Sequence, residues 1–594
     1  MTKIKEKVGK TAFALVATLA IVAVVAIFLF LIVKSAPAFA EIGVFDFIFG
    51  DKWQPSSSDV YGEPLAGSYG VFTMIVGTLA VTVGALAFGG TLGYFTATFL
   101  AFFCPSRLKK VLSVAVDILA GIPSVIYGFF GVRFLLPLLS VFAPNNGTGL
   151  LATSLVLGIM ILPTVVALSK TSMEAVPSTY YEGAVALGAT HTQAVFHTVV
   201  PVSRSGIVAS LVLGVGRALG ETMAVVMIAG NSATYPSGLF GSFRVLTANI
   251  VLEMGYAGEV QEGALVATGV VLLGFVLLVN LFFSAFSKRT KREKKKKCTR
   301  AGMRIRDFFG NISYKIKGAE TGKIVSIASG VFVVLVLVLL VGFVTVKGLP
   351  HITPYFLFGE FDFGGDKISI FSSIVTTLMA VALSLVIAVP VGVATAVFLH
   401  EYASADGFFV RIVRGAIDLL SGVPSIVYGL FGMITFVRLF GGTSSILAGS
   451  LTVSVMLLPT VVRSTEESLK AVGEGLREGS FALGAGKLRT IIKIVLPSAL
   501  GGILSATVLA TGRVVSESAP FLYTAGSVIW AMPKSYLDNG ATLAVAMYRL
   551  AGEGWHTDEA YATAVVLVFI VLALNLLAGL LAKKLRKKWT GEKQ

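Results

Sequence analysis

The sequence contains one arrangement of residues twice, and this repeat constrains the architecture that the chain can adopt. EGAVALGATHTQAVFHTVVP begins at Glu182 and leads into an apolar stretch that ends in GRALGE, residues 216–221. EGSFALGAGKLRTIIKIVLP begins at Glu478 and is followed by GRVVSE, residues 512–517. The matching residues of the two copies are separated by a constant 296 positions. We therefore expect two halves that share one fold.

The composition places both halves in a membrane. The 594 residues are 55% hydrophobic and only 13% charged, whereas a soluble domain carries about 25% charged residues. A membrane-spanning helix needs about 20 apolar residues. Such segments lie near 11–33, 70–102, 111–139, 150–169, 205–229, 263–286, 322–346, 370–399, 411–440, 445–462, 498–522 and 559–582. We expect an all-α, polytopic protein with about twelve transmembrane helices in two homologous six-helix halves.

The charges predict the orientation of these helices. The net charge of +16 is concentrated in short basic segments between apolar runs, as cytoplasmic loops require. It therefore does not indicate nucleic-acid binding. We expect a multi-pass protein of the cell membrane with both termini in the cytosol. The first apolar run, Thr11–Val33, is longer than the roughly 7–15 residues of a signal-peptide core, so we interpret it as a retained span.

The halves are expected at 1–287 and 322–594, joined by a basic cytosolic linker at 288–321. The linker has two interpretations: a solvated connection that touches anionic lipid headgroups, or a binding site for a specific partner. Each half has an even number of spans, so both halves have the same orientation. The segments that begin at Glu182 and Glu478 should then both face the cytosol, where a symmetric pair of partner subunits fits them.

Charged residues lie inside the fifth span of each half. Arg217 lies about 12 residues, or roughly 18 Å, into its span, and Arg513 occupies the same depth in the second half. Glu221 and Glu517 are expected one turn later on the same helix, within reach of an ion pair. Because buried charges are costly in a membrane, two interpretations remain. Either the pairs neutralise each other structurally, or they line a path in which two guanidinium groups bind an oxyanion.

The sequence contains no recognisable energy source or catalytic constellation. No G-x-x-x-x-G-K-[ST] phosphate-binding loop is present. Cys104 and Cys298 have no spacing typical of a metal site. We therefore expect a transporter and not an enzyme, with no metal site and no cofactor bound by this chain.

The repeated cytosolic segments resemble the E-A-A…G loop of permease subunits of bacterial ABC importers. Its positions match Glu182 and Gly188, then Glu478 and Gly484, although this chain has E-G-A and E-G-S in place of E-A-A. The resemblance implies a type I importer permease. It also implies that each loop forms a short coupling helix that docks on a cytosolic ATPase dimer, which carries the ATP and Mg.

Further motifs resemble the permeases of the high-affinity phosphate importer. IPSVIYGFFG (122–131) and GRALGETMAV (216–225) are similar to its first permease subunit, and VPSIVYGLFG (423–432) and GRVVSESAP (512–520) to its second. The resemblance implies a gene fusion that imports inorganic phosphate by alternating access between the two halves. It also implies an extracytoplasmic phosphate-binding protein and a role in transport for Arg217, Glu221, Arg513 and Glu517.

The alternatives belong to two classes. The chain is also consistent with a permease for another oxyanion, such as sulfate or molybdate. A secondary transporter driven by an ion gradient is the alternative from a different class, because it would need no ATPase partner.

Overall fold

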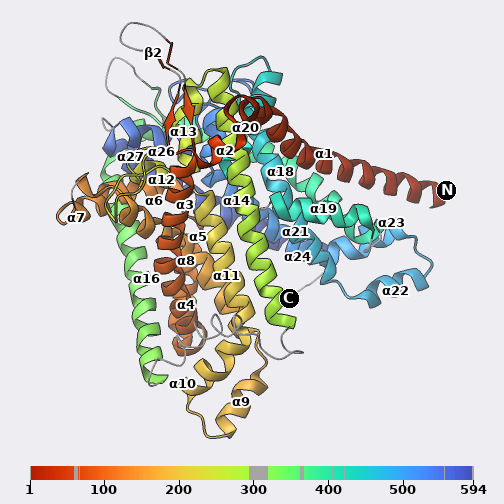
Figure 1. Ribbon diagram of the computed structural model, residues 1–594. Helices are drawn as coiled ribbons and strands as arrows, with labels where there is room; N and C mark the ends of the chain where they lie inside the picture. The colour runs from red at the N-terminus through yellow and green to blue at the C-terminus, as the bar shows by residue number, and fades with distance from the viewer. Residues whose placement is uncertain are drawn as a thin grey trace. The chain divides into compact units, whose positions relative to one another are not determined.

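The computed structural model describes residues 2–55, 57–58, 64–65, 67–143, 145–292, 319–361, 367–403, 407–420, 422–553 and 556–590. Most of the predicted basic linker, residues 293–318, lies outside this part of the chain. The described residues are almost entirely helical (Figure 1). This confirms the predicted all-α, membrane-spanning fold class.

The elements of the first half run from α1 to α14. Their bounds are α1 Thr2–Ile42, α2 Val44–Phe49, β1 Trp53–Gln54, β2 Ser57–Ser58, β3 Pro64–Leu65, β4 Ser68–Tyr69, α3 Phe72–Ala85, η1 Leu86–Gly90, α4 Thr91–Thr98, η2 Phe99–Phe103, α5 Ser106–Gly121, α6 Ser124–Phe130, η3 Gly131–Leu135, α7 Leu136–Ser140, η4 Asn145–Gly147, α8 Leu150–Glu174, α9 Ser178–Ala186, α10 His191–Ala194, η5 Val195–Val199, α11 Val200–Gly220, α12 Met223–Ile228, α13 Leu246–Glu253, η6 Met254–Tyr256 and α14 Glu259–Arg292. The short strands pair antiparallel, β1 with β4 and β2 with β3.

The second half repeats this order. Its elements are α16 Ala319–Gly348, η8 Leu349–His351, α17 Pro354–Phe358, α18 Phe371–Val397, η9 Phe398–Tyr402, α19 Phe408–Leu420, α20 Ser425–Gly432, η10 Met433–Val437, α21 Ile446–Lys470, α22 Glu474–Ala482, α23 Lys487–Thr490, η11 Ile491–Val495, α24 Leu496–Ser516, α25 Ala519–Thr524, α26 Leu543–Glu553 and α27 Thr557–Thr590. Helices α8 and α21 each have 25 residues, α9 and α22 nine, and α11 and α24 21. The predicted duplication is therefore present in the structure.

Ten helices in the described chain are long and apolar enough to cross a membrane, or eleven if one bent pair counts as a span. The bent pair is the predicted third span, in which Ser106–Gly121 and Ser124–Ser140 meet at 95°. The predicted ninth span is also divided, into α19 and α20 with η10. The other ten predicted segments each overlap one of the long helices.

Proline causes the break in both of these spans. In a continuous helix the carbonyl of Leu119 would accept the amide of residue 123, which is a proline without an N–H. That carbonyl accepts the Ile122 amide at 3.3 Å and the hydroxyl of the buried Tyr127 at 2.6 Å. Tyr428 donates to Leu420 in the same way, at 2.9 Å. The tyrosine of each P-S-x-x-Y motif therefore supplies a second donor to the carbonyl that its proline cannot pair with, beside the amide of Ile122 or Val423.

The described chain packs as two units that differ from the sequence halves. The first unit contains Phe45–Asn249 and Val271–Val346, and the second unit contains Met1–Val44, Ile250–Val270 and Lys347–Gln594. The first helix of each half therefore packs in the unit formed mainly by the other half. The boundaries 1–287 and 322–594 remain predictions about the repeat, which the packing units do not reproduce.

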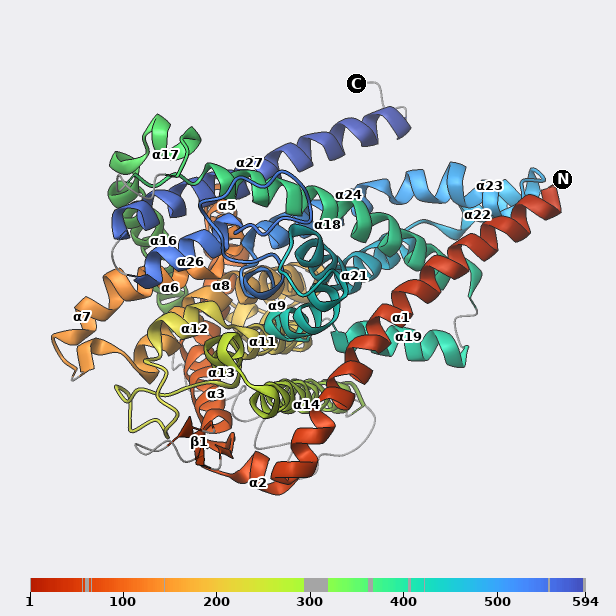
Figure 2. The same cartoon turned by 90° about the horizontal axis from the view of Figure 1, so that it is seen from above.

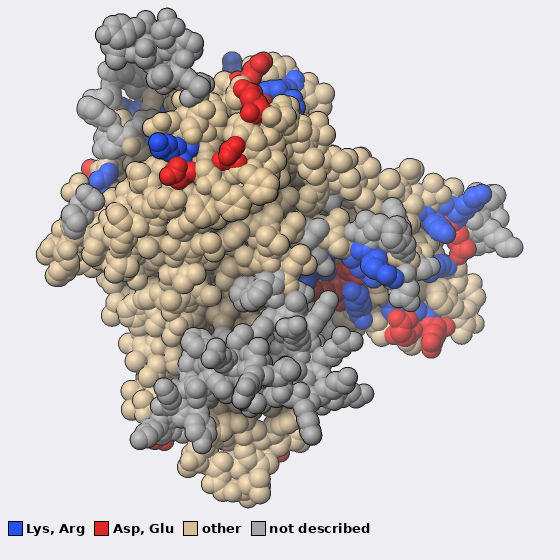
Figure 3. All heavy atoms as spheres, viewed as in Figure 1, with Lys and Arg blue, Asp and Glu red and all other residues tan. Residues whose placement is uncertain are grey.

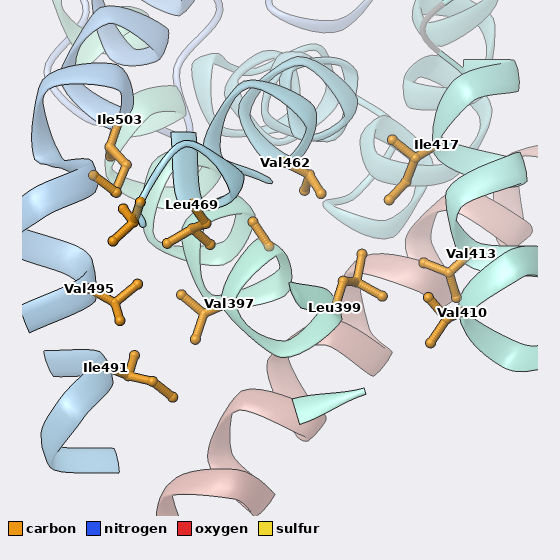
Figure 4. Packing of buried hydrophobic residues seen from close by; sticks show 13 residues of the cluster. Val397, Leu399, Val410, Val413, Ile417, Val462, Leu469, Ile491, Val495 and Ile503 are labelled. Carbon is orange, nitrogen blue, oxygen red and sulfur yellow. The ribbon is translucent and has the colours of Figure 1, made fainter. Parts of the chain in front are cut away.

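Helix α1 packs against the core of the unit that the second half mainly forms. A buried cluster joins α18, η9, α19, α21, η11 and α24 (Figure 4). Phe13 and Ile21 of α1 pack against this cluster, and the ring of Phe13 stacks on Tyr402 at 5.9 Å. The N-terminal end of α1 lies beside α22 and α23 (Figure 2). In the other unit, Val334 of α16 packs against a cluster formed by α4, η2, α5 and α8.

Candidate functional site

Each unit holds one of the two intramembrane arginines in the same way. Arg217 lies in the last turn of α11, and its Nη1 donates to Oγ1 of Thr164 on α8 at 3.1 Å. Arg513 lies in the last turn of α24, and its Nη1 donates to Thr460 on α21 at 3.2 Å. The two partners are 53 residues from their arginines.

The two glutamates lie at helix breaks, which corrects the predicted continuous fifth span. Helix α11 ends at Gly220, and Glu221 has extended backbone angles of φ −72° and ψ 136°. Helix α24 ends at Ser516, and Glu517 has φ −77° and ψ 133°. The expectation that each glutamate lies one turn further along the same helix was therefore wrong.

Hydrogen bonds to Glu221 explain why the chain tolerates a break inside an apolar region. The Glu221 carbonyl accepts the hydroxyl of Thr247 at 2.8 Å. The Glu221 carboxylate accepts the Ala224 amide in the first turn of α12 at 3.4 Å, a position that favours negative charge. One carbonyl and one amide at the break are thus satisfied, which reduces the cost of a break in an apolar surrounding.

In the second unit the break also has a covalent cause. Pro520 lies in the first turn of α25. Its ring would clash with the carbonyl of residue 516 if α24 continued, and it has no amide to donate. This proline is present in the motif GRVVSESAP and was a signal that the helix ends before it. The first half has no proline at the matching position.

The expected ion pair is present in the second unit, where Nε of Arg513 lies 3.5 Å from Oε1 of Glu517. In the first unit the Glu221 side chain accepts a hydrogen bond from Ser124, the residue that follows Pro123. The break in the fifth span thus contacts the break in the third span. Involvement of these four charged residues in transport stays a prediction.

The sequence alone did not indicate the two threonines that hold the arginines. Thr164 and Thr460 belong to the identical motif LPTVV at 162–166 and 458–462, which repeats at the same separation of 296 residues. Threonine commonly bonds within its own helix. Only the packing of α8 on α11, and of α21 on α24, shows that these two hydroxyls accept from arginine.

The second part of the candidate site consists of the short helices α9 and α22, which carry Glu182 and Glu478. Each ends in a glycine with positive φ, Gly188 at +89° and Gly484 at +79°. The amides of Gly188 and Ala189 donate to the carbonyls of Val185 and Ala184. This is the bonding pattern of a helix that ends in left-handed glycine, and the second copy repeats it.

Both short helices present an exposed surface with an apolar tip. Glu182 and Glu478 are exposed, and the neighbouring Leu187 and Leu483 are 92% and 91% exposed. Helix α9 lies at the tip of the segment between α8 and α10 (Figure 1). On the face shown in Figure 3, charged side chains gather around α22, α23 and the start of α1. A pair of exposed, structurally equivalent helices is suited to bind a pair of equivalent partners.

Relatives of this chain have been described as transport proteins. It is 30% identical over 520 residues to a phosphate transport system permease protein PstA homolog of Mycoplasma pneumoniae, with 77% of each chain covered. It is 37% identical to the probable ABC transporter permease protein YqgH of Bacillus subtilis, over 49% of this chain and 93% of that protein. It is 33% identical to the phosphate transport system permease protein PstC of Haemophilus influenzae, over 46% of this chain and 90% of that one.

The family model of the binding-protein-dependent transport system inner membrane component matches residues 89–292 and again 388–591. Each match contains one arginine–threonine pair and one exposed short helix. The members of this family are transport permease subunits, not enzymes. The chain is a multi-pass membrane protein that belongs to the binding-protein-dependent transport system inner membrane component family, with two copies of the family domain in tandem.

Proposed function

We propose that this chain is the complete transmembrane permease of an ATP-driven importer of inorganic phosphate. The observation that carries the proposal is the duplicated arrangement of an arginine, its threonine partner and a glutamate at a helix break. Both copies occur in one chain, so one chain supplies both halves of a permease. The printed names of the relatives support phosphate as the substrate.

The side chains of this arrangement suit phosphate better than sulfate. A guanidinium group binds an oxyanion through two parallel hydrogen bonds. A nearby carboxylate repels a fully ionised anion but accepts a hydrogen bond from an anion that still carries a proton. Inorganic phosphate keeps at least one proton near neutral pH, because it loses its last proton only in strongly alkaline solution, whereas sulfate keeps none. Glu221 and Glu517 would therefore favour phosphate.

The energy for transport is proposed to come from separate ATPase subunits, on which ATP and Mg are bound. The exposed helices α9 and α22 are the proposed docking elements, with Glu182, Gly188, Glu478 and Gly484 in the coupling loops. An extracytoplasmic phosphate-binding protein would deliver the anion. In this arrangement the chain lies in the cell membrane with both termini in the cytosol.

A reconstituted complex tests the proposed substrate. We expect phosphate, added with its binding protein, to stimulate ATP hydrolysis in proteoliposomes, and sulfate to leave the rate at its basal value. Measuring hydrolysis with both anions at equal ionic strength checks this. Equal stimulation by sulfate would identify a general oxyanion permease. Uptake of phosphate without any ATPase subunit would identify a secondary transporter and would refute the proposal.

The threonine partners give a second, independent prediction. Thr164→Val and Thr460→Val keep the side-chain volume but remove the hydroxyl that accepts from arginine. A hydrogen bond to a charged group contributes about 1.5–3 kcal/mol, so uptake should fall roughly tenfold or more in each variant. Initial rates of phosphate uptake in membrane vesicles measure this. Thr171→Val on α8 is the matched control, because the Thr171 hydroxyl bonds within its own helix, and its uptake should be normal.

A further inference from the structure

The second short helix contains a buried arginine that the proposed transport path does not use. Of the nine residues of α22, all of which the structure describes, only Arg477 and Ser480 are buried. The side chain of Arg477 is 7% exposed. Arginine is rarely buried to this extent unless it is paired, so its partners indicate what α22 is attached to.

The guanidinium group of Arg477 joins α22 to two long helices of the same unit. Its Nε and Nη2 donate to Oε1 of Glu401 at 3.2 and 3.0 Å. Nη1 donates to the carbonyl of Val472 at 2.8 Å, and Nη2 to the carbonyl of Leu469 at 3.0 Å. Leu469 is in the last turn of α21, where carbonyls have no partner within the helix. Arg477 thus binds the end of α21 as well as Glu401.

Glu401 lies in η9, the π turn that ends α18. Its side chain is only 8% exposed, and the turn is closed by the amide of Ala403, which donates to Phe398 at 3.0 Å. The neighbouring His400 accepts from Nη2 of Arg477 through Nε2, at 3.3 Å. Because a guanidinium has no acceptor atom, the contact requires a neutral imidazole ring at His400. Such π turns often mark functional positions in long helices.

The first short helix has no comparable attachment. Tyr181 occupies the position that matches Arg477. Its hydroxyl bonds Nδ1 of His191 at 2.7 Å, and Nε2 of that ring lies 3.2 Å from the carbonyl of Phe102. None of the nine residues of α9, all described, is buried. The two short helices are therefore alike on the outside but differ in how they are held.

We propose that Arg477 is a positioning residue that ties α22 to α18 and α21, so that these three helices move as one body when an ATPase subunit moves α22. The inference rests on the proposed function, since it specifies how force enters the permease. Helix α21 also carries Thr460, which holds Arg513. Leu469 and Thr460 are nine residues apart on this helix, about 14 Å. A continuous series of contacts therefore links Arg477 to Arg513 through α21. In the first half the corresponding position has only the hydrogen bond between Tyr181 and His191.

The test removes both buried charges, because replacing one would leave the other buried without a partner. In Arg477→Met/Glu401→Gln the fold is expected to persist, since no buried net charge remains. We expect the ATPase subunits to stay bound and basal hydrolysis to stay unchanged. ATP hydrolysed per phosphate imported in proteoliposomes should rise roughly fivefold or more. An unchanged ratio would overturn the proposal.

Two single variants serve as controls. Glu474 also contacts Arg477, at 3.3 Å, but its side chain is 77% exposed, and exposed ion pairs contribute little. Glu474→Gln should therefore leave the ratio normal. Tyr181→Phe removes the corresponding hydrogen bond in the first half and should also have a small effect. If either control raised the ATP hydrolysed per phosphate imported as much as the double variant does, a special role for Arg477 would be contradicted.

Amide hydrogen exchange separates this inference from the proposed function, because it needs neither phosphate nor ATPase. In the purified full-length chain, amides of α22 should exchange more slowly than those of α9. The double variant should raise exchange in α22 about tenfold and leave α9 unchanged. Equal exchange in α22 before and after substitution would overturn the inference. If the wild-type complex showed no response to phosphate, the proposed function would fail while this measurement still decided the role of Arg477.

Discussion

Replacing Arg217 or Arg513 by alanine is expected to abolish phosphate uptake while the chain remains in the membrane. In the proposed path each guanidinium group would donate charged hydrogen bonds to the anion, and losing them would cost about 3 kcal/mol or more, a factor of at least about 100 in uptake rate. Alanine keeps the backbone hydrogen bonds and favours the helix, so the substitution should leave α11 and α24 intact. Initial rates of phosphate uptake, normalised to the amount of chain in the membrane, measure the effect.

Three further substitutions define what the arginines contribute. Arg204 lies on the same helix as Arg217, and Arg204→Ala should transport normally. Arg217→Lys and Arg513→Lys keep the charge but lose the planar fork of donors, so they should retain only part of the activity. If uptake survives in both alanine variants, the arginines serve the structure alone, and the proposed path is wrong.

Placing glutamate at both exposed leucines of the short helices is expected to detach the ATPase subunits. Leu187 and Leu483 are 92% and 91% exposed among the described residues, so Leu187→Glu/Leu483→Glu should leave the fold intact. Burying a leucine in an interface contributes about 2 kcal/mol, so each site should weaken binding roughly 30-fold. Co-purification of the ATPase subunits, and their dissociation constant for the purified chain, measure the loss.

The matched control for this experiment lies elsewhere on the second unit. Leu439 follows η10 and is also largely exposed, so Leu439→Glu introduces the same charge on a surface outside the short helices. It should bind the ATPase subunits normally. Normal binding by the double leucine variant would show that α9 and α22 are not the docking elements.

The glycines that follow the short helices α9 and α22 could be identified from the sequence, because their role depends on local backbone geometry. A glycine at the end of a short helix is the residue that adopts positive φ without strain, and both Gly188 and Gly484 do so. The positions of Glu221 and Glu517 could not be predicted in this way. Hydropathy averages over many residues and does not register a break of two residues. Such a break is stable only because distant groups such as Thr247 satisfy the freed carbonyl.

The same difference between local and distant contacts applies to the residues on which the two proposals rest. The sequence placed Arg217 and Arg513 at equivalent depths, because the repeat is exact in length over those segments. It did not identify Thr164, Thr460 or the partnership of Arg477 with Glu401. These residues are 53 and 76 positions from their partners, and no local pattern encodes a contact at such a distance.

The sequence by itself determined the family, the duplication, the number of apolar segments and the paired exposed helices. These properties follow from hydropathy, charge and short motifs, which depend on residues that are close together in the sequence. The tertiary structure alone decided that α1 and α16 pack in the units formed mainly by the opposite halves. A helix surrounded by lipid is apolar on every side, so its pattern of hydrophobic residues does not specify which neighbour it packs against. That choice depends on shape and on a few polar contacts, such as Glu6 of α1 accepting the Lys487 amide.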